Sequence, residues 1–168
     1  MIHEPTVIQF SKMLQNLSAL LDKAAAHAEA KKFDVDVLLA SRLAPDQFNF
    51  TRQVLITCDT AKLGVARLAG KEAPVHADTE KTLPELKARI DSTLAFLGTV
   101  SAQDLAEAAE RHITQPRWEG KYLTGEEFLV EYALPNFYFH LTTAYAILRH
   151  NGVEVGKKDY LGQMPFKK

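Results

Sequence analysis

Apolar side chains recur every three or four residues along three segments of the chain, and this period predicts amphipathic helices that share a core. The second segment stops before Gly70, a residue that suits the left-handed turn after a helix. The third opens with Thr82 and Glu85, which have the spacing of a capping box, in which each side chain satisfies a free backbone N–H. The three helices are predicted at residues 6–30, 45–69 and 83–97, with Pro45 at the first position of the second.

A fourth helix is predicted at residues 124–151, where apolar residues fall on nearly every side of the helical axis. Such a helix is expected to be surrounded by others and almost completely buried. Thr124 and Glu127 form a second capping box, and Gly152 marks the end. Pro135 lies inside this helix and removes one backbone hydrogen bond, so we expect a kink there and not a break.

The segments between these helices are shorter and less regular. They are predicted to form a helical turn at residues 34–41, a polar surface loop at 71–81, a short helix at 101–110 and an irregular or briefly extended stretch at 111–123. The C-terminal tail is expected to dock along the bundle without forming an element of its own. The chain is therefore predicted to be all-α, a single four-helix-bundle domain over residues 1–168 with short additional helices and an irregular C-terminal tail.

Composition argues against several classes of function. The 168 residues are 46% apolar and carry a formal net charge of −1, without the basic excess that binds nucleic acid. No stretch has the length and apolar character of a membrane span, and the N-terminal residues lack the pattern of a signal peptide. Cys58 is the only cysteine, which is typical of a reducing compartment. We therefore expect a cytoplasmic protein with neither a nucleic-acid nor a membrane partner.

A polar stripe interrupts the apolar fourth helix. Four polar residues are spaced to lie on one of its faces, namely Tyr132, Asn136, His140 and Thr143. These side chains are candidates for the wall of a ligand pocket, because pockets in helical bundles are lined by facing helical side chains. Their alternative role is structural, and it is the more common one, because a buried polar group is usually satisfied by a neighbour such as a backbone carbonyl.

Two stretches of the chain resemble the signature sequences of a known superfamily. They are APDQFNFTRQVLITCDTAKLGVARLAG, which begins at Ala44, and LPNFYFHLTTAYAILRHNGVEVGKKDYLG, which begins at Leu134. Both are similar to a bacterial branch, with no assigned function, of the DinB/YfiT-like superfamily. The resemblance implies a DinB-like four-helix bundle, commonly a homodimer. Many members of the superfamily hold a divalent metal through three histidines, and some are metal-dependent thiol transferases or isomerases.

The metal-binding residues of that superfamily are only partly present in this chain. His140 matches the second histidine of a His-x-x-x-His pair, but Asn136 stands where the first is expected. The third histidine should lie on the second helix, where the nearest substitutes are Cys58 and Asp59. A set of His140, Asn136 and Asp59 suits Mn, Fe or Ni in principle, but a neutral amide adds little affinity and Asp59 is equally placed to pair with a basic residue on its own helix. We therefore expect no metal cofactor.

Two further residues have competing interpretations. Cys58 has apolar neighbours and no adjacent basic residue, so an inert buried thiol is favoured over a nucleophile. Trp118 suits a cap over the mouth of the bundle better than a platform for a planar ligand. The sequence contains no glycine-rich phosphate loop and no CxxC, HExxH or GxSxG motif.

Two hypotheses about function follow. In the favoured one, the protein is a metal-free, dimeric bundle that binds a small ligand or acts as an interaction module, with its former metal pocket filled by Asn136, His140 and aromatic side chains. In the alternative, it is a metal-dependent enzyme of the thiol transferase or isomerase type that uses His140 as a base or ligand. The candidate pocket residues are Tyr132, Asn136, His140, Thr143, Cys58, Asp59 and Trp118.

Overall fold

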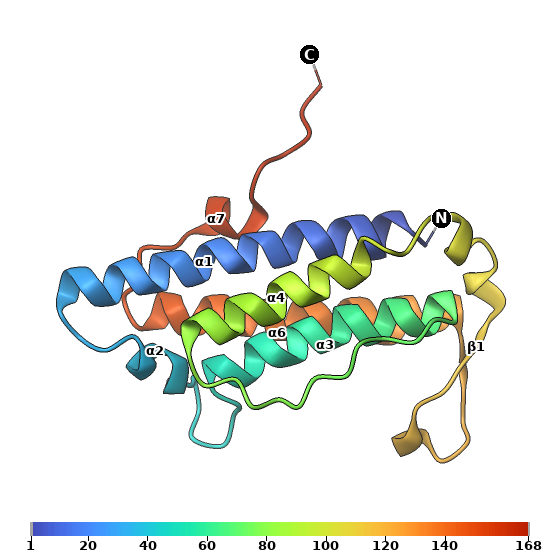
Figure 1. Cartoon of the computed structure of the whole chain (residues 1–168), viewed down its shortest axis with the longest axis horizontal. Coiled ribbons are helices and arrows are strands. Elements are labelled where there is room, and N and C mark those ends of the chain that lie inside the picture. Colours follow the sequence, from blue (N-terminus) through green and yellow to red (C-terminus); the bar gives the residue numbers. More distant parts are fainter. Residues whose placement is uncertain (1, 168) are drawn as a thin grey trace.

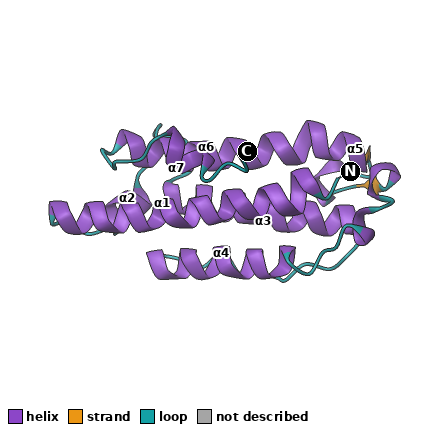
Figure 2. Cartoon of the chain, turned by 90° about the horizontal axis from the view of Figure 1, so that it is seen from above, coloured by secondary structure: helices purple, strands orange, loops and turns teal. Residues whose placement is uncertain are grey.

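Four long helices lie side by side along the long axis of the molecule (Figures 1 and 2), in a computed structural model that describes residues 2–167. The fold is all-α, as predicted. Both α1 and α3 pack against α4 and α6. The long helices are α1 (Gln9–Lys31), preceded by the π-helical turn η1 (Glu4–Ile8), α3 (Phe50–Ala69), α4 (Leu83–Leu97) and α6 (Leu134–His150).

Short elements connect the long helices. The segment that the sequence predicts to be irregular or extended makes a small excursion at one end of the bundle, in which β1 pairs antiparallel with β2 (Figure 1). The short elements are α2 (Asp36–Ala40), η2 (Gln103–Leu105), η3 (Ala108–Glu110), β1 (His112–Ile113), η4 (Pro116–Trp118), β2 (Leu123–Thr124), α5 (Gly125–Glu127), η5 (Phe128–Ala133) and α7 (Lys157–Leu161). The predicted turn at 34–41 corresponds to α2, and the predicted helix at 101–110 is two 3₁₀ turns.

The apolar faces of the long helices meet in one continuous core. Phe10 of α1 stacks on Phe137 of α6 with ring centroids 4.2 Å apart, and both side chains are completely buried. Each such aromatic side chain removes a large apolar area from water, which is the main favourable contribution to folding. The capping box predicted at Thr82 is present, and α4 ends at the predicted position before Gly98.

The second long helix begins later than the sequence predicts. Its N-cap is Asn49, whose side-chain oxygen accepts a hydrogen bond of 3.0 Å from the backbone N–H of Arg52. Pro45 instead lies in the connection between α2 and α3. The prediction was wrong because Asn49 satisfies an otherwise unpaired donor of the first turn, whereas a proline in that connection satisfies none. The end is as predicted, at Gly70 with φ of 64°.

The predicted fourth helix consists of three consecutive elements, α5, η5 and α6. Its capping box forms between Thr124 and Glu127. The π-helical segment η5 ends just before Pro135, whose ring would clash with the carbonyl four residues back in a regular α-helix. A π-helical turn is wider than an α-helical one. The chain therefore passes the proline without a break.

The expectation that this helix is almost completely buried was wrong. Val130 and Phe139 are 54% and 56% exposed, and Glu131 and Pro135 are also exposed on the same side. In a four-helix bundle each helix faces two neighbours and the core, so one side of every helix stays outside. An apolar residue on that side is therefore in contact with water, whatever the average hydropathy of the helix.

The predicted loop at residues 71–81 is held in place by ion pairs. Arg89 of α4 has a side chain that is 1% exposed, and it donates to Asp59 of α3 at 2.9 Å. It also donates to Asp78 and Glu80 of the loop, at 2.8 and 2.6 Å. Three carboxylates around one guanidinium compensate for its burial. These ion pairs therefore hold the loop against α3 and α4.

The C-terminal tail docks on α1, as expected, but the expectation that it forms no element of its own was wrong. It forms the short helix α7, whose first turn is capped by Asp159 accepting from the backbone N–H of Gly156 at 2.8 Å. Asn16 donates to the carbonyl of Tyr160 at 3.0 Å, and Lys23 forms an ion pair with Asp159 at 2.7 Å. Beyond α7 the chain leaves the bundle (Figure 1).

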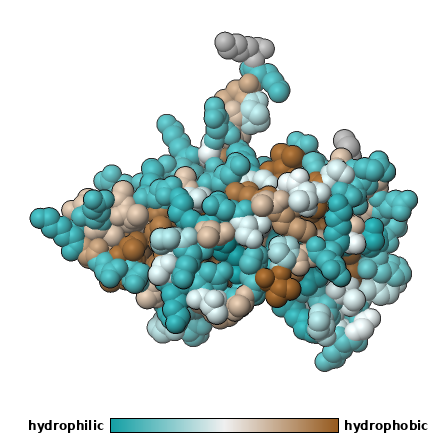
Figure 3. Space-filling view, viewed as in Figure 1, coloured by the Kyte–Doolittle hydropathy of each residue, from teal (hydrophilic) through white to brown (hydrophobic). Residues whose placement is uncertain are grey.

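The outer surface in the view of Figure 3 is mostly hydrophilic, with scattered apolar side chains. Within residues 2–167, no helix combines the length and the apolar character that crossing a bilayer requires.

Candidate functional site

A cleft of about 330 Å³ lies between α3 and the η5–α6 helix, and the segment around η4 closes one of its ends. Its volume is within the range of pockets that hold small organic molecules. The cleft combines apolar and aromatic walls with several charged and amide groups. It is lined by Phe48, Arg52, Ile56, Asp59, Thr60, Leu63, Gly64, Arg67, Gln115, Arg117, Phe128, Tyr132, Asn136 and His140.

The cleft follows the line along which α3 and α6 pack. His140 contacts Gln53, Asn136 contacts Thr60, and Gly64 lies opposite Ala133, so residue numbers rise along one helix as they fall along the other. The two helices are therefore antiparallel. A Cβ atom added to Gly64 would meet only the Cβ of Ala133, at 3.8 Å. The missing side chain at Gly64 thus leaves space in the floor of the cleft.

The side chain of Gln53 orients His140, and the backbone carbonyl of Phe48 in turn orients Gln53. His140 is 8% exposed, and its Nδ1 lies 2.7 Å from Oε1 of Gln53. The amide nitrogen of Gln53 donates to the carbonyl of Phe48 at 3.1 Å, which assigns its oxygen to the histidine. Burial, and then the charge of Arg52, lower the pKa of His140. The ring is therefore neutral at pH 7, with a proton on Nδ1 and a lone pair on Nε2.

Asn136 belongs to a second chain of hydrogen bonds. Its side-chain nitrogen donates to Oγ1 of Thr60 at 2.8 Å, and that hydroxyl donates to the carbonyl of Ile56 at 2.8 Å. From the sequence, the structural role of these polar groups was expected to involve a neighbour such as a backbone carbonyl. Both residues instead bond to side chains of α3, and both still line the cleft.

Asp59 lines the cleft, but its charge is compensated. Its carboxylate lies 2.9 Å from Nζ of Lys62 and 2.9 Å from the guanidinium of Arg89. Arg52, which also lines the cleft, forms an ion pair with Asp78 of the loop at 2.7 Å. The charges of Asp59 and Arg52 are thus neutralised within the protein.

Aromatic and basic side chains gather at the end of the cleft near η4. The guanidinium of Arg117 donates to the hydroxyl of Tyr132 and lies 5.2 Å from the centroid of its ring. Trp118 contacts Phe128 and Tyr132 edge to face, with centroids 6.2 and 5.7 Å away. Trp118 therefore packs against two aromatic residues of the cleft wall and is not itself among the residues that line the cleft.

Two other candidate residues lie away from this cleft. The side chain of Cys58 is completely buried in the core, and burial raises the pKa of its thiol to about 12. A thiol with that pKa is protonated at pH 7 and inert, as the sequence favoured. Thr143 is 7% exposed, and its hydroxyl donates to the carbonyl of Phe139 at 2.7 Å. The structure thus gathers Tyr132, Asn136, His140 and Asp59 in one cleft.

The residues around His140 do not fit the three-histidine metal site that the superfamily implies. Within residues 2–167, no three side chains of the His, Cys, Asp or Glu types are placed to hold a metal ion together. Asn136 offers the N–H₂ end of its amide to Thr60, and Asp59 is engaged by two cations. A catalytic divalent metal normally needs three dependable protein ligands and an open position.

Several residues that line the cleft were not predicted from the sequence. Arg52, Thr60 and Arg67 share one face of α3 with Ile56 and Leu63, and their spacing could have revealed them. Gln115 and Arg117 follow no helical period, because they lie in the excursion between α4 and α5. Only the folded chain brings that segment to the end of the cleft.

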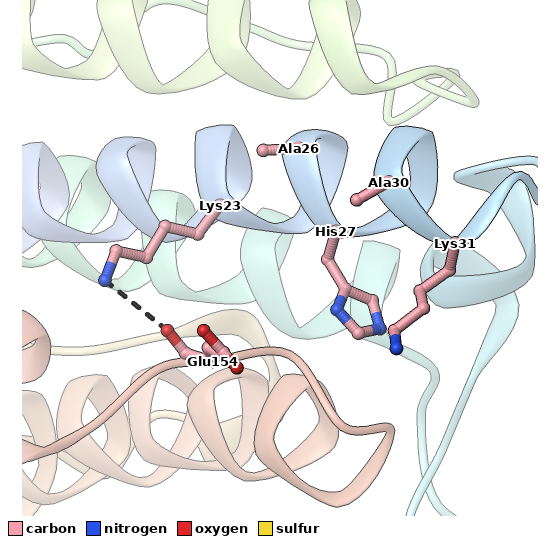
Figure 4. Close-up of a pocket in the computed structure, with 6 residues that line it drawn as sticks. All are labelled: Lys23, Ala26, His27, Ala30, Lys31 and Glu154. Carbon is pink, nitrogen blue, oxygen red and sulfur yellow. Dashed lines mark hydrogen bonds between the residues drawn. The ribbon is translucent and has the colours of Figure 1, made fainter.

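A second hollow, of about 370 Å³, lies between α1 and the segment after α6. Figure 4 shows Lys23, His27 and Lys31 along α1 with Glu154 opposite, and Lys23 donating to the carbonyl of Glu154 at 3.4 Å. Lys23 is already paired with Asp159. The hollow lacks the aromatic wall and the buried amide groups of the α3–α6 cleft, so it is the weaker candidate.

Comparisons with known proteins find a matching family and a solved structure with the same helical-bundle fold. The profile of a family described as "Domain of unknown function (DUF1993)" matches residues 2–161. The chain is 65% identical to a DinB family member protein from Shewanella denitrificans, whose crystal structure superposes with a TM-score of 0.97. The alignment covers 100% of this chain and 96% of that one. No curated protein matches the chain.

Proposed function

The chain belongs to the DUF1993 family and shares the fold of a DinB family member, and from this premise we propose that it binds a small organic ligand in the α3–α6 cleft without a metal ion. The observation that carries the proposal is the cleft itself. Its apolar walls and a few fixed polar groups are the usual composition of a small-molecule site. The superfamily's metal positions are occupied by side chains that bond across to α3, at Gln53 and Thr60.

The polar side chains of the cleft are already oriented by hydrogen bonds within the protein. Gln53 sets the tautomer of His140, so Nε2 is a hydrogen-bond acceptor, and Thr60 directs the Asn136 amide so that its oxygen stays an acceptor. Ile56, Leu63 and Phe128 supply apolar contact. A ligand that matches these groups would not require the side chains to rearrange, which lowers the cost of binding.

The test is a titration followed by ¹H–¹⁵N NMR. Benzyl alcohol, benzoate and benzylamine present one ring with a neutral, an acidic and a basic group. We expect at least one of them to shift the amide signals of Gly64, Asn136 and His140 in a saturable way. Lys31, beside the second hollow, serves as the internal control. If no probe moves the cleft signals at millimolar concentration, the proposal is wrong.

The alternative is a metal-dependent enzyme of the thiol transferase or isomerase type centred on His140. It is favoured by one observation, that Nε2 of His140 makes no hydrogen bond to residues 2–167. Metal analysis of protein purified without a nickel column distinguishes the two proposals. Stoichiometric metal in the native protein, lost in His140→Ala, would establish the alternative and refute the metal-free site.

We also propose that the protein is a homodimer, as the family resemblance implies. The exposed apolar side chains of Val130 and Phe139 on one side of η5 and α6 are suited to contact with a second copy. Sedimentation at micromolar concentration is expected to give twice the chain mass of 18.8 kDa. A single 18.8 kDa species would refute the dimer and leave the ligand proposal untouched.

A further inference from the structure

We propose that the end of the cleft near η4 binds the carboxylate or phosphate group of a small organic anion, an inference that rests on the function proposed above. Three side chains define this anion subsite: Arg67, Arg117 and Gln115. Arg67 comes from the last turn of α3, and the other two come from the excursion that closes the cleft. They are distant in sequence, and the fold brings all three to the lining of one cleft.

The anion subsite has positive charge without a compensating carboxylate. Within residues 2–167, neither Arg67 nor Arg117 has a carboxylate oxygen within 4 Å, whereas Arg52 at the other end of the cleft is paired with Asp78. Asp59, the acidic residue that lines the cleft, is already bonded to two cations. The formal net charge of the whole chain is −1, so this excess is local and does not follow from composition.

Burial makes the guanidinium of Arg67 costly to leave unpaired, and the exposed Arg117 places a second positive charge beside it. Arg67 is half-buried, and this burial lowers its pKa, with the charge of Arg117 acting in the same direction. Two like charges near each other in a partly desolvated site repel each other more strongly than they would in water. An anion between them would remove that repulsion and gain charge-assisted hydrogen bonds.

Gln115 supplies an independent indication of a ligand. It is 9% exposed, and its side-chain nitrogen is buried with no hydrogen-bond partner in the described chain. A buried donor without a partner costs free energy and calls for an explanation. Because Gln115 lines the same cleft as the two arginines, a rotation of its amide would turn this nitrogen from its buried position towards an anionic oxygen in the anion subsite.

The arrangement also indicates the shape of the anion. The bond from Arg117 to the Tyr132 hydroxyl orients that guanidinium and leaves most of its five N–H donors available. Planar guanidinium groups match the paired oxygens of carboxylate and phosphate. Leu63 and Phe128 line the adjoining part of the cleft, so an apolar or aromatic body attached to the anionic group would lie against them.

Calorimetric titration of the intact protein with benzoate, phenyl phosphate, inorganic phosphate and benzyl alcohol tests this proposal. We expect the two organic anions to bind more tightly than benzyl alcohol, with affinity that falls as salt is added. In Arg67→Met with Arg117→Met, the affinity for these anions should fall about tenfold or more, while that for benzyl alcohol stays unchanged. Arg67→Lys keeps the positive charge but not the planar guanidinium with its paired N–H donors. Its affinity for the anions should fall less than that of the double methionine variant.

The matched control is Arg149→Met, which removes an exposed arginine from the last turn of α6, outside the cleft. Circular dichroism and the Tm of every variant report whether it folds. Comparison of phenyl phosphate with benzoate decides between a phosphate and a carboxylate, and inorganic phosphate shows whether the apolar body contributes.

Three outcomes would overturn the anion subsite. If benzyl alcohol binds as tightly as the anions, or if the double arginine variant folds and keeps its affinity for them, the two arginines do not bind an anionic group and the subsite is wrong, while ligand binding in the cleft stands. If none of the probes binds, the proposed function fails together with it.

Discussion

Replacing Arg89 with methionine removes the charge that holds the 71–81 loop against the bundle. Its guanidinium is 1% exposed and bonds to Asp59, Asp78 and Glu80. Methionine fills a similar volume but leaves three carboxylates facing one another without their shared cation. The expected result is a less stable protein in which the loop is held more weakly, by contacts such as the ion pair between Arg52 and Asp78.

The magnitude follows from the burial of the three carboxylates. Removing one partner of a fully buried ion pair costs about 3–5 kcal/mol, because the remaining charge is uncompensated. Here Asp59, Asp78 and Glu80 are 25%, 30% and 15% exposed, so water recovers part of that cost. We expect a loss of about 2–4 kcal/mol, a large part of the about 5–15 kcal/mol by which domains are stable.

Urea denaturation of Arg89→Met measures this loss, and Arg52→Met is the matched control. Among residues 2–167 the guanidinium of Arg52 forms an ion pair with Asp78 only, and its side chain is 41% exposed, so its removal should cost under about 1 kcal/mol. Arg89→Met should also weaken binding of benzoate, because the carboxylate of Asp59, which lines the cleft, then loses one of its two cations and keeps only Lys62. A loss below about 1 kcal/mol for Arg89→Met would refute the reasoning, since the two arginines would then be equivalent.

The same network predicts acid sensitivity. Burial tends to raise the pKa of Asp78, but hydrogen bonds from Arg52 and Arg89 outweigh it, and the pKa is lowered. A carboxylate whose pKa is lower in the folded state contributes stability above its ordinary pKa and loses it as the pH falls through the folded value. The free energy of unfolding of the native protein should therefore fall as the pH drops below about 4. It should fall less with pH in Arg89→Met.

Three further predictions concern local features. Gly64→Ala should raise the free energy of unfolding by about 0.5–1 kcal/mol and weaken ligand binding, because the methyl group fits the space in the cleft floor; urea denaturation showing a loss of stability would contradict this. Asn49→Ala should lower stability by about 1 kcal/mol through loss of the N-cap, with Asn49→Asp as the control that keeps it. The hydrogen bond from Lys71, with those from Ser101, lowers the pKa of Asp104 to about 2, and in Lys71→Met a carboxyl NMR titration should find it nearer 3.8.

The helices were predictable because their signals are local. The capping boxes at Thr82 and Thr124 and the glycine after α3 are interactions within one turn of backbone, so the residues alone specify them. The start of α3 was predicted wrongly because Pro45 suits the first position of a helix, whereas in the structure Asn49 caps the first turn through its side chain.

The candidate site was predictable only in part. The spacing of Tyr132, Asn136 and His140 placed them on one face, and the structure brings all three to one cleft. Their hydrogen-bond partners, Gln53 and Thr60, lie 87 and 76 residues away in sequence. No periodicity connects residues so far apart.

The sequence by itself determined the four helices, their apolar faces and the fact that one of them carries a polar stripe. These features depend on contacts between neighbours along the chain, for which residue spacing is sufficient. Only the tertiary structure decided that Asp59 is neutralised by Arg89, that η5 and α6 keep one side in water, and that Gln115 and Arg117 reach the end of the cleft. The physical reason is that charge compensation and burial depend on distances through space, which are set when helices pack and loops close.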